Sequence, residues 1–238
     1  MTGPAPAFYA LRRGGWRDYV TLLHLPYTAW HLSYVVIGAA LAPIWRPERL
    51  GLSLGAFFLG VGVGAHALDE LTGRPLRTAI PRSFLVGLAG AAVTGACAIG
   101  VVAAVLWHPW LLAFVAAGAV IVVAYNLELL GGRLHTDLWF ALSWGGLPLL
   151  AAYFVAAGDV TWVALLACAF ASLSSLAQRR LSLPVRRLRR AAVARGAIDV
   201  DGEAITRESL IATYDRALQA LCAAIVALAV ALALLRAA

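Results

Sequence analysis

The sequence predicts an all-α protein, a polytopic bundle of about seven transmembrane helices. Of its 238 residues, 62% are hydrophobic and only 13% are charged, whereas soluble domains average about 45–50% apolar residues. The apolar residues form long runs, and the arginines lie in the gaps between them. An apolar excess of this size and pattern is typical of a chain whose solvent is lipid.

Seven apolar runs define the predicted spans. A membrane-spanning helix needs about 20 mostly apolar residues, and seven runs meet or approach that length. They cover residues 25–43, 51–68, 84–107, 110–130, 138–156, 160–176 and 217–235. The chain is therefore divided into an N-terminal segment, 1–24, and one transmembrane domain, 25–238, with a long loop at about 178–215. In that loop, Asp201-Gly202 predicts a turn and Thr206 predicts the start of a short helix.

The arginines orient the predicted bundle. All 19 basic residues are arginine; sixteen fall on the side of the N-terminus and three on the other side. Arginine-rich loops stay in the cytoplasm, so the N-terminus is expected in the cytoplasm and the C-terminus outside. The net charge of +7 is then a sign of orientation in a cell membrane and not of nucleic-acid binding.

Three ionisable residues end the second run. His66, Asp69 and Glu70 lie at positions i, i+3 and i+4, so a helix places them on one face. An imidazole and two carboxylates on one face can hold a divalent cation, and ionisable groups at membrane depth are candidates for function. Arg74 and Arg77 follow and could bind phosphate. The alternative is a solvated helix end with a local His–Asp pair.

A second polar cluster follows the fourth run. Tyr125 and Asn126 end that run, and His135 and Asp137 come after a Gly-Gly bend that could return them to the bundle. The alternative is an ordinary interfacial loop. His31, inside the first run, either belongs to the same site or hydrogen-bonds with a neighbouring helix.

Arginines follow the sixth run. Arg179, Arg180 and Ser182 begin a segment in which guanidinium groups could bind the phosphate oxygens of a lipid or a substrate diphosphate. The alternative is a topology signal that also contacts anionic headgroups.

These three segments, in this order and on one predicted side, resemble the UbiA superfamily of intramembrane prenyltransferases. Residues 25–28 look like that family's entry to helix one. Residues 65–69 occupy its first aspartate motif, and the Arg-Pro-Leu at 74–76 matches the usual tail. Residues 125–128 look like its Tyr-led segment after helix four, and 178–185 resemble the tail of its second motif. The likeness covers about residues 20–190.

The resemblance implies an all-helical fold, an aspartate site for Mg²⁺ and an isoprenoid diphosphate, and a lateral cavity for a long apolar chain. It implies that Asp69 and Glu70 hold Mg²⁺, with His66 and Tyr125 beside them among the catalytic residues. It also implies a set of residues that contact the substrate: Arg74, Arg77, Asn126, Arg179, Arg180 and Ser182. The chain departs from the family pattern because His66 occupies an aspartate position and the second motif contains no aspartate.

Three functions are consistent with these residues. The first, which we favour, is a UbiA-like enzyme that transfers or cyclises an isoprenoid or other lipid. The second is a membrane enzyme that uses Fe or Zn on a lipid, since imidazole and carboxylate suit those metals. Its ligands would come from His31, His66, Asp69, Glu70, His135 and Asp137. The third is a non-catalytic protein that binds a lipid or a partner protein.

Overall fold

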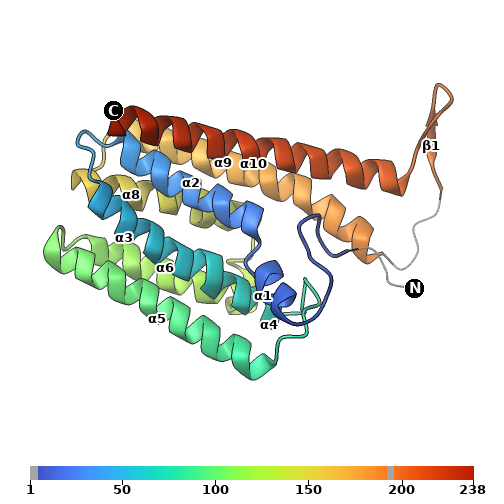
Figure 1. Cartoon of the computed structure of the whole chain (residues 1–238), viewed down its shortest axis with the longest axis horizontal. Helices are drawn as coiled ribbons and strands as arrows, with labels where there is room; N and C mark the ends of the chain where they lie inside the picture. Colours follow the sequence, from blue (N-terminus) through green and yellow to red (C-terminus); the bar gives the residue numbers. More distant parts are fainter. Residues whose placement is uncertain (1–4, 192–195) are drawn as a thin grey trace.

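The computed structural model describes residues 5–191 and 196–238, and nearly all of its regular structure is helical (Figure 1). Here η1 and η3 are π-helical turns and η2 is a short 3₁₀ turn. The elements in chain order are α1 (Trp16–Leu22), α2 (Leu25–Leu41), α3 (Pro47–Phe57), η1 (Phe58–Ala65), α4 (His66–Leu71), α5 (Arg82–Leu106), α6 (Leu111–Asn126), η2 (Leu130–Gly132), α7 (Asp137–Ala141), η3 (Leu142–Gly146), α8 (Leu147–Ala157), α9 (Trp162–Arg190), β1 (Ile198–Val200), β2 (Glu203–Ile205) and α10 (Arg207–Ala237).

Five helical stretches are long and apolar enough to cross a membrane. They are Pro47–Leu71, Arg82–Leu106, Asp137–Ala157, Trp162–Arg190 and Arg207–Ala237. Helices α2 and α6, with 17 and 16 residues, are shorter but occupy two further predicted runs. The predicted all-α class is confirmed, and the long apolar helices are those of a helical membrane bundle.

The prediction of a long loop at about 178–215 is wrong over most of that range. Residues 178–190 are not loop but the last turns of α9, which runs unbroken through Pro184. Helix α10 begins at Arg207, capped by Thr206, whose hydroxyl accepts from Ser209 N while the Ser209 hydroxyl accepts from Thr206 N. The predicted turn at 201–202 closes the antiparallel β1–β2 hairpin. The loop prediction was wrong because an arginine-rich helix end is polar without being irregular.

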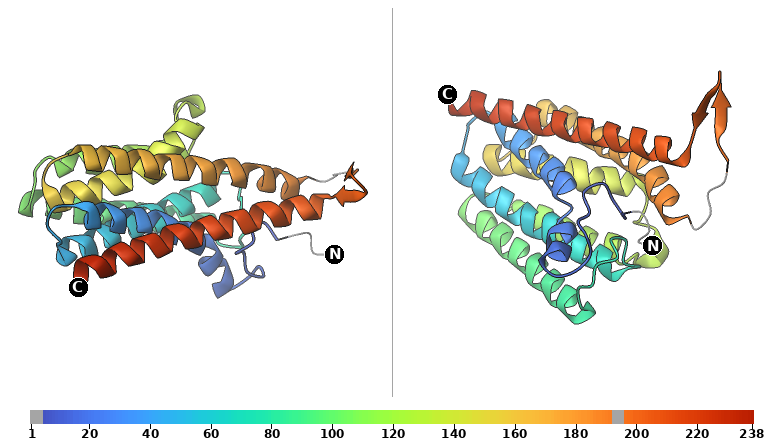
Figure 2. Two further views of the ribbon diagram at one scale, coloured as in Figure 1. Left: turned by 90° about the horizontal axis from the view of Figure 1, so that it is seen from above. Right: turned by 45° about the vertical axis from the view of Figure 1, so that its right-hand side comes forward.

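The connections gather at two ends of the bundle (Figures 1 and 2). One end holds the N-terminal segment, the connections 72–81 and 127–136 and the β1–β2 hairpin, and we call it the arginine-rich end. The other holds the connections 42–46, 107–110 and 158–161 and the C-terminus, and we call it the opposite end. Helices α9 and α10 run past the other helices at the arginine-rich end.

The centre of the bundle is packed around α2. Trp30, Tyr34 and Leu149 are fully buried in one cluster that joins α2 to α8, α9 and α10. A Cβ on Gly38 would lie 2.2 Å from the Leu149 carbonyl oxygen, and one on Gly145 would lie 2.3 Å from that of Ala171. Glycine at these two positions lets the backbones of adjacent helices touch, as is usual where helices pack in lipid.

Candidate functional site

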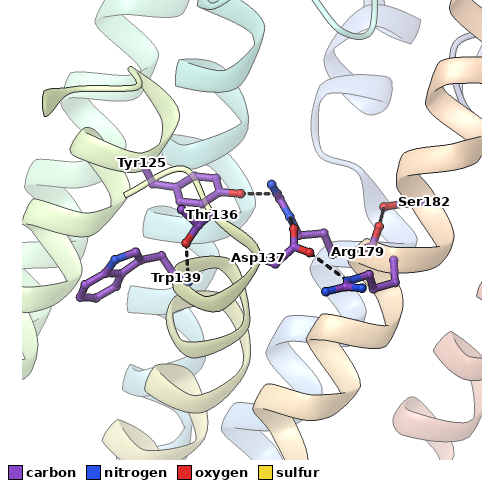
Figure 3. A network of polar contacts seen from close by, with 7 residues as sticks. Tyr125, Thr136, Asp137, Trp139, Arg179 and Ser182 are labelled. Carbon is purple, nitrogen blue, oxygen red and sulfur yellow. Dashed lines mark hydrogen bonds and ion pairs between the residues drawn. The ribbon is translucent and has the colours of Figure 1, made fainter. Parts of the chain in front are cut away.

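The polar segments that follow α6 and end α9 are joined by one network of contacts (Figure 3). The Tyr125 hydroxyl hydrogen-bonds with the Arg179 guanidinium, 54 positions away in the chain. Arg179 Nε donates to Asp137 Oδ1 over 2.7 Å. Arg180 Nε lies 2.9 Å from Asp137 Oδ2. The structure thus brings the second and third predicted clusters together at the arginine-rich end.

Aromatic rings surround Arg179. Its guanidinium carbon lies 5.1 Å from the centre of the Phe140 ring and 5.9 Å from that of Tyr125, within the range of cation–π attraction. The His135 ring stacks on Tyr125 with centroids 4.4 Å apart, and His135 Nδ1 hydrogen-bonds with the Tyr125 carbonyl oxygen over 3.1 Å. The bend at Gly131 and Gly132, both with positive φ, returns His135 to the bundle.

Glu70 is fully buried and organises the connection 72–81. Its Oε1 accepts from Thr78 N and Thr78 Oγ1, and its Oε2 accepts from Leu76 N, each over 2.9 Å. Helix α4 ends at Leu71, and the chain then folds back so that its free N–H groups meet this carboxylate. A buried carboxylate is stable only when it is bonded in this way. The sequence predicted that Glu70 and Asp69 hold a metal ion together. In the structure, the Glu70 oxygens are instead occupied by the connection 72–81.

Asp69 has different surroundings. It is half-buried, and its carboxylate has no ion-pair or hydrogen-bond partner among residues 5–191 and 196–238. The charge that acts on it most strongly is that of Arg186 on α9, and Asp69 is in turn the charge that acts most strongly on Arg186. A carboxylate without a bonded partner can bind a cationic or polar group or accept a proton, and a guanidinium, which stays protonated, can bind an anion.

His66 is paired with a residue that the sequence analysis passed over. The rings of His66 and His24 stack with centroids 4.0 Å apart, and His66 Nδ1 hydrogen-bonds with the Gly62 carbonyl oxygen over 3.0 Å. His24 Nδ1 hydrogen-bonds over 2.9 Å with the hydroxyl of Tyr9, in the N-terminal segment. Tyr27 of α2 packs edge-on against Phe8 and Tyr9 of this segment, so the segment closes the site from the N-terminal side.

Both ends of that hydrogen bond are uncharged at neutral pH. Burial lowers the pKa of His24 well below its usual value, and the adjacent His66 lowers it further. Burial also raises the pKa of the Tyr9 hydroxyl, although Arg186 opposes that shift. His24, Tyr9, Tyr27 and Arg186 line a cavity of about 30 Å³, which is room for two or three water molecules at about 10–15 Å³ each.

Three further predicted site residues are engaged within the bundle. His31 Nδ1 hydrogen-bonds over 2.8 Å with the Trp144 carbonyl oxygen, which lies in the π-helical turn η3. Of the two readings of His31, this geometry agrees with a hydrogen bond to a neighbouring helix. Asn126 Nδ2 donates to the Val122 carbonyl oxygen over 2.7 Å, and the Ser182 hydroxyl donates to the Arg179 carbonyl oxygen over 3.1 Å.

Arg74 and Arg77 lie at the rim of the site. Arg74 Nη1 donates to the carbonyl oxygens of Thr78 and Ile80, each over 3.0 Å. Arg77 is exposed. With Arg13 and Arg190 the two arginines line an open basic surface. They remain accessible to an anionic group at this end.

The residues present do not fit the expected metal. In the parts of the chain that the structure describes, no three His, Cys, Asp or Glu side chains are grouped as metal ligands would be. The oxygens of Glu70 accept from the connection 72–81, and those of Asp137 pair with two arginines. Asp69 alone is too small a donor set for Mg²⁺. His31 and His135 hydrogen-bond with different carbonyl groups, those of Trp144 and Tyr125, and belong to no group of three ligand side chains in the described parts of the chain.

Two residues of the site, Tyr9 and His24, were not singled out from the sequence, and Arg186 was considered only as a member of the arginine segment that follows the sixth run. The only local signal was the position of His24 one residue before the helix that begins with Leu25-Pro26. Their partners lie far away along the chain, so no spacing rule could have found them. In comparisons with family models, curated proteins and solved structures, the chain matched none.

Proposed function

We propose that this chain is an intramembrane enzyme, UbiA-like in its plan, that acts on an isoprenoid or other lipid carrying a phosphate group. In this proposal the bundle crosses the membrane seven times, with the arginine-rich end in the cytoplasm and the C-terminus outside. Two observations carry it. Arg179 joins the polar segment after α6 to the end of α9, and Asp69, whose carboxylate has no bonded partner among the described residues, lies within the influence of the charges of Arg186 and His135 from those two segments.

The chemistry proposed is transfer or cyclisation of a prenyl group. The bond between the allylic carbon and the diphosphate oxygen breaks, and the electron pair leaves with the diphosphate. Arg186 and the rim residues Arg74 and Arg77 stabilise that anion, because guanidinium groups bind phosphate oxygens in pairs. The acceptor, or a double bond of the same chain, attacks the carbon and loses a proton. Asp69 is the nearest carboxylate able to take that proton.

Metal ions have no part in this proposal, because the donor set does not fit one. In the family that the chain resembles, Mg²⁺ would neutralise the negative charge of the diphosphate. In this proposal, arginine side chains neutralise it. Preorganised charges in a site with little water can supply much of the stabilisation that such a leaving group needs.

A panel of isoprenoid diphosphates, incubated with the purified protein in mild detergent with and without EDTA, tests the function. Product is followed by mass spectrometry. Asp69→Asn is expected to reduce turnover by about 10²–10⁴-fold, the usual contribution of a positioned acid or base. Asp159→Asn, the same change at an exposed residue of the opposite end, is the control. Turnover that survives in Asp69→Asn, or is absent from wild type with every substrate, contradicts the proposal.

A non-catalytic lipid-binding protein is the second candidate. It is favoured by the fact that Glu70 and Asp137 are both occupied by contacts within the protein. For this candidate, Asp69→Asn would leave lipid binding unchanged and no substrate in the panel would turn over.

A further inference from the structure

An apolar cavity lies at the other end of the bundle from the candidate site. It has a volume of about 120 Å³ and lies among α3, η1, α5, α6 and α8. Its walls include Phe57, Gly60, Gly100, Phe114 and Gly118. The residues of α3 that line it come from the start of the stretch Pro47–Leu71, and those of α5 come from its second half, so the cavity lies toward the opposite end.

Glycines make this cavity. A Cβ on Gly118 would meet no atom within 4 Å, whereas one on Gly100 would lie 2.4 Å from Val115. Gly118 therefore leaves open space inside the cavity, and Gly100 brings α5 and α6 close together at its edge. An apolar cavity of about 150 Å³ stays dry and binds a molecule the size of benzene, so this cavity has room for a segment of an acyl chain.

A charged and aromatic cluster lies next to the cavity. Trp107 lines it, and the Arg49 guanidinium carbon lies 4.8 Å from the Trp107 ring centre. Arg49 Nη1 donates to the Val155 carbonyl oxygen over 2.8 Å and lies 3.4 Å from His108 Nε2. In the described part of the chain, Arg49 Nη2 has no hydrogen-bond partner. Ser53, one turn after Arg49 on α3, also lines the cavity.

Tryptophans place this cluster at the level of the lipid headgroups. Trp110 and Trp162, at the same end of the bundle, are 77% and 80% exposed, although large aromatic rings are rarely left so bare in water. Exposed tryptophans at helix ends are typical of the interface between membrane and water. A phosphate held at this level would have its acyl chain at the depth of the cavity.

We infer that this cavity binds a segment of one acyl chain of a membrane phospholipid, whose phosphate group is held by Arg49. The inference is independent of the proposed enzymatic function, because no residue of the candidate site lines the cavity. The chain is apolar like the walls, and the phosphate meets the free donors of a guanidinium that the Trp107 ring and the Val155 carbonyl hold in place.

Native mass spectrometry of the delipidated full chain in dodecyl maltoside tests this site. Two lipids are added back, dioleoylphosphatidylglycerol and dioleoylglycerol, which have the same chains but differ in the phosphate. Gly118→Phe places a ring in the cavity. Gly87→Phe is its matched control, since Gly87 also has open space around its Cβ position but lies on the exposed face of α5. Thermal unfolding verifies that each variant is folded.

We expect one phosphatidylglycerol per chain in wild type and Gly87→Phe, with binding weakened at least tenfold in Gly118→Phe. We also expect dioleoylglycerol to bind at least tenfold more weakly than phosphatidylglycerol, and Arg49→Gln to remove that difference. Equal binding to Gly118→Phe and Gly87→Phe overturns the cavity as the site. Equal binding of the two lipids to wild type overturns the role of Arg49. Because the two lipids are compared on wild type, the second result does not depend on the folding of Arg49→Gln.

Discussion

Two adjacent residues of helix α4, Asp69 and Glu70, carry the same chemical group in different surroundings. Glu70 is fully buried and accepts three hydrogen bonds from the connection 72–81. Asp69 is half-buried, and although the charge of Arg186 acts on it most strongly, it forms no ion pair with that residue. Adjacent carboxylates can therefore have unrelated roles, and the one with the most protein contacts is the weaker candidate for chemistry, because its oxygens are already occupied.

The largest effect on folding is expected from Glu70→Ala. The change leaves the N–H groups of Leu76 and Thr78 buried without an acceptor, and each hydrogen bond to a charged group contributes about 1.5–3 kcal/mol. Because neighbouring bonds are not additive, a loss of about 3 kcal/mol or more is expected. It would appear as a lower thermal midpoint in detergent and as faster tryptic cleavage at Arg77.

Asp69→Ala is the matched control for that prediction. It removes a carboxylate of similar size with no bonded partner among the described residues, so the free energy of unfolding should change by about 1 kcal/mol or less. If Asp69→Ala destabilises the protein as much as Glu70→Ala does, the contrast between the two carboxylates of α4 is wrong.

A smaller effect is expected where Arg179 joins α6, α7 and α9. Arg179→Met removes its contacts with Asp137 and Tyr125 and should cost about 1–3 kcal/mol of stability, measured by thermal or denaturant unfolding. In a double-mutant cycle with Asp137→Asn, the coupling energy should be about 1 kcal/mol. It is not larger because the Asp137 side chain is 34% exposed and water screens the pair.

Arg180 is the control within the same network. Its side chain is 68% exposed, although it also pairs with Asp137. Exposed ion pairs contribute little, so the cycle of Arg180→Met with Asp137→Asn should give a coupling near zero. Equal coupling for the two arginines would show that the network is a surface feature and not a clamp between helices.

The smallest effect is expected from the pH dependence of the N-terminal segment. The pKa of His24 is lower in the folded protein than in the unfolded chain, where it is about 6.5. The unfolded chain therefore binds the proton first as pH falls below about 6.5. Stability should be constant above that pH and should decrease below it, by at most about 1.4 kcal/mol per pH unit for this group.

Hydrogen exchange of residues 5–24 at pH 7.5 and pH 5.5 measures this loss. His24→Asn is the control, because Asn tolerates the left-handed backbone that His24 adopts (φ 46°) and does not titrate in this range. The acid-induced increase in exchange should shrink in this variant. If it persists unchanged, another group, such as His66, is responsible.

Much of the fold could be predicted from local pattern. Each apolar run contains a helix, and most of the arginine-bearing connections gather at one end. A helix begins after Thr206 as expected, but α10 has 31 residues and is not the short helix predicted, because it continues into the last apolar run. These features depend on hydropathy, helix capping and charge, which act over a few residues. The extent of α9 was missed, because residues 178–190 are polar and contain Pro184, and both features also fit a loop.

What the sequence by itself determined is a chain of apolar helices with its polar residues gathered between them, because burial in lipid and the length of a helical span follow from composition along the chain. Only the tertiary structure decided which polar residues meet. In it, Glu70 accepts hydrogen bonds from the connection 72–81, Asp69 is influenced most by the charge of Arg186, and His24 stacks on His66. These contacts depend on the packing of distant helices and on where a returning backbone places its N–H groups. Neither can be predicted from the spacing of residues along the chain.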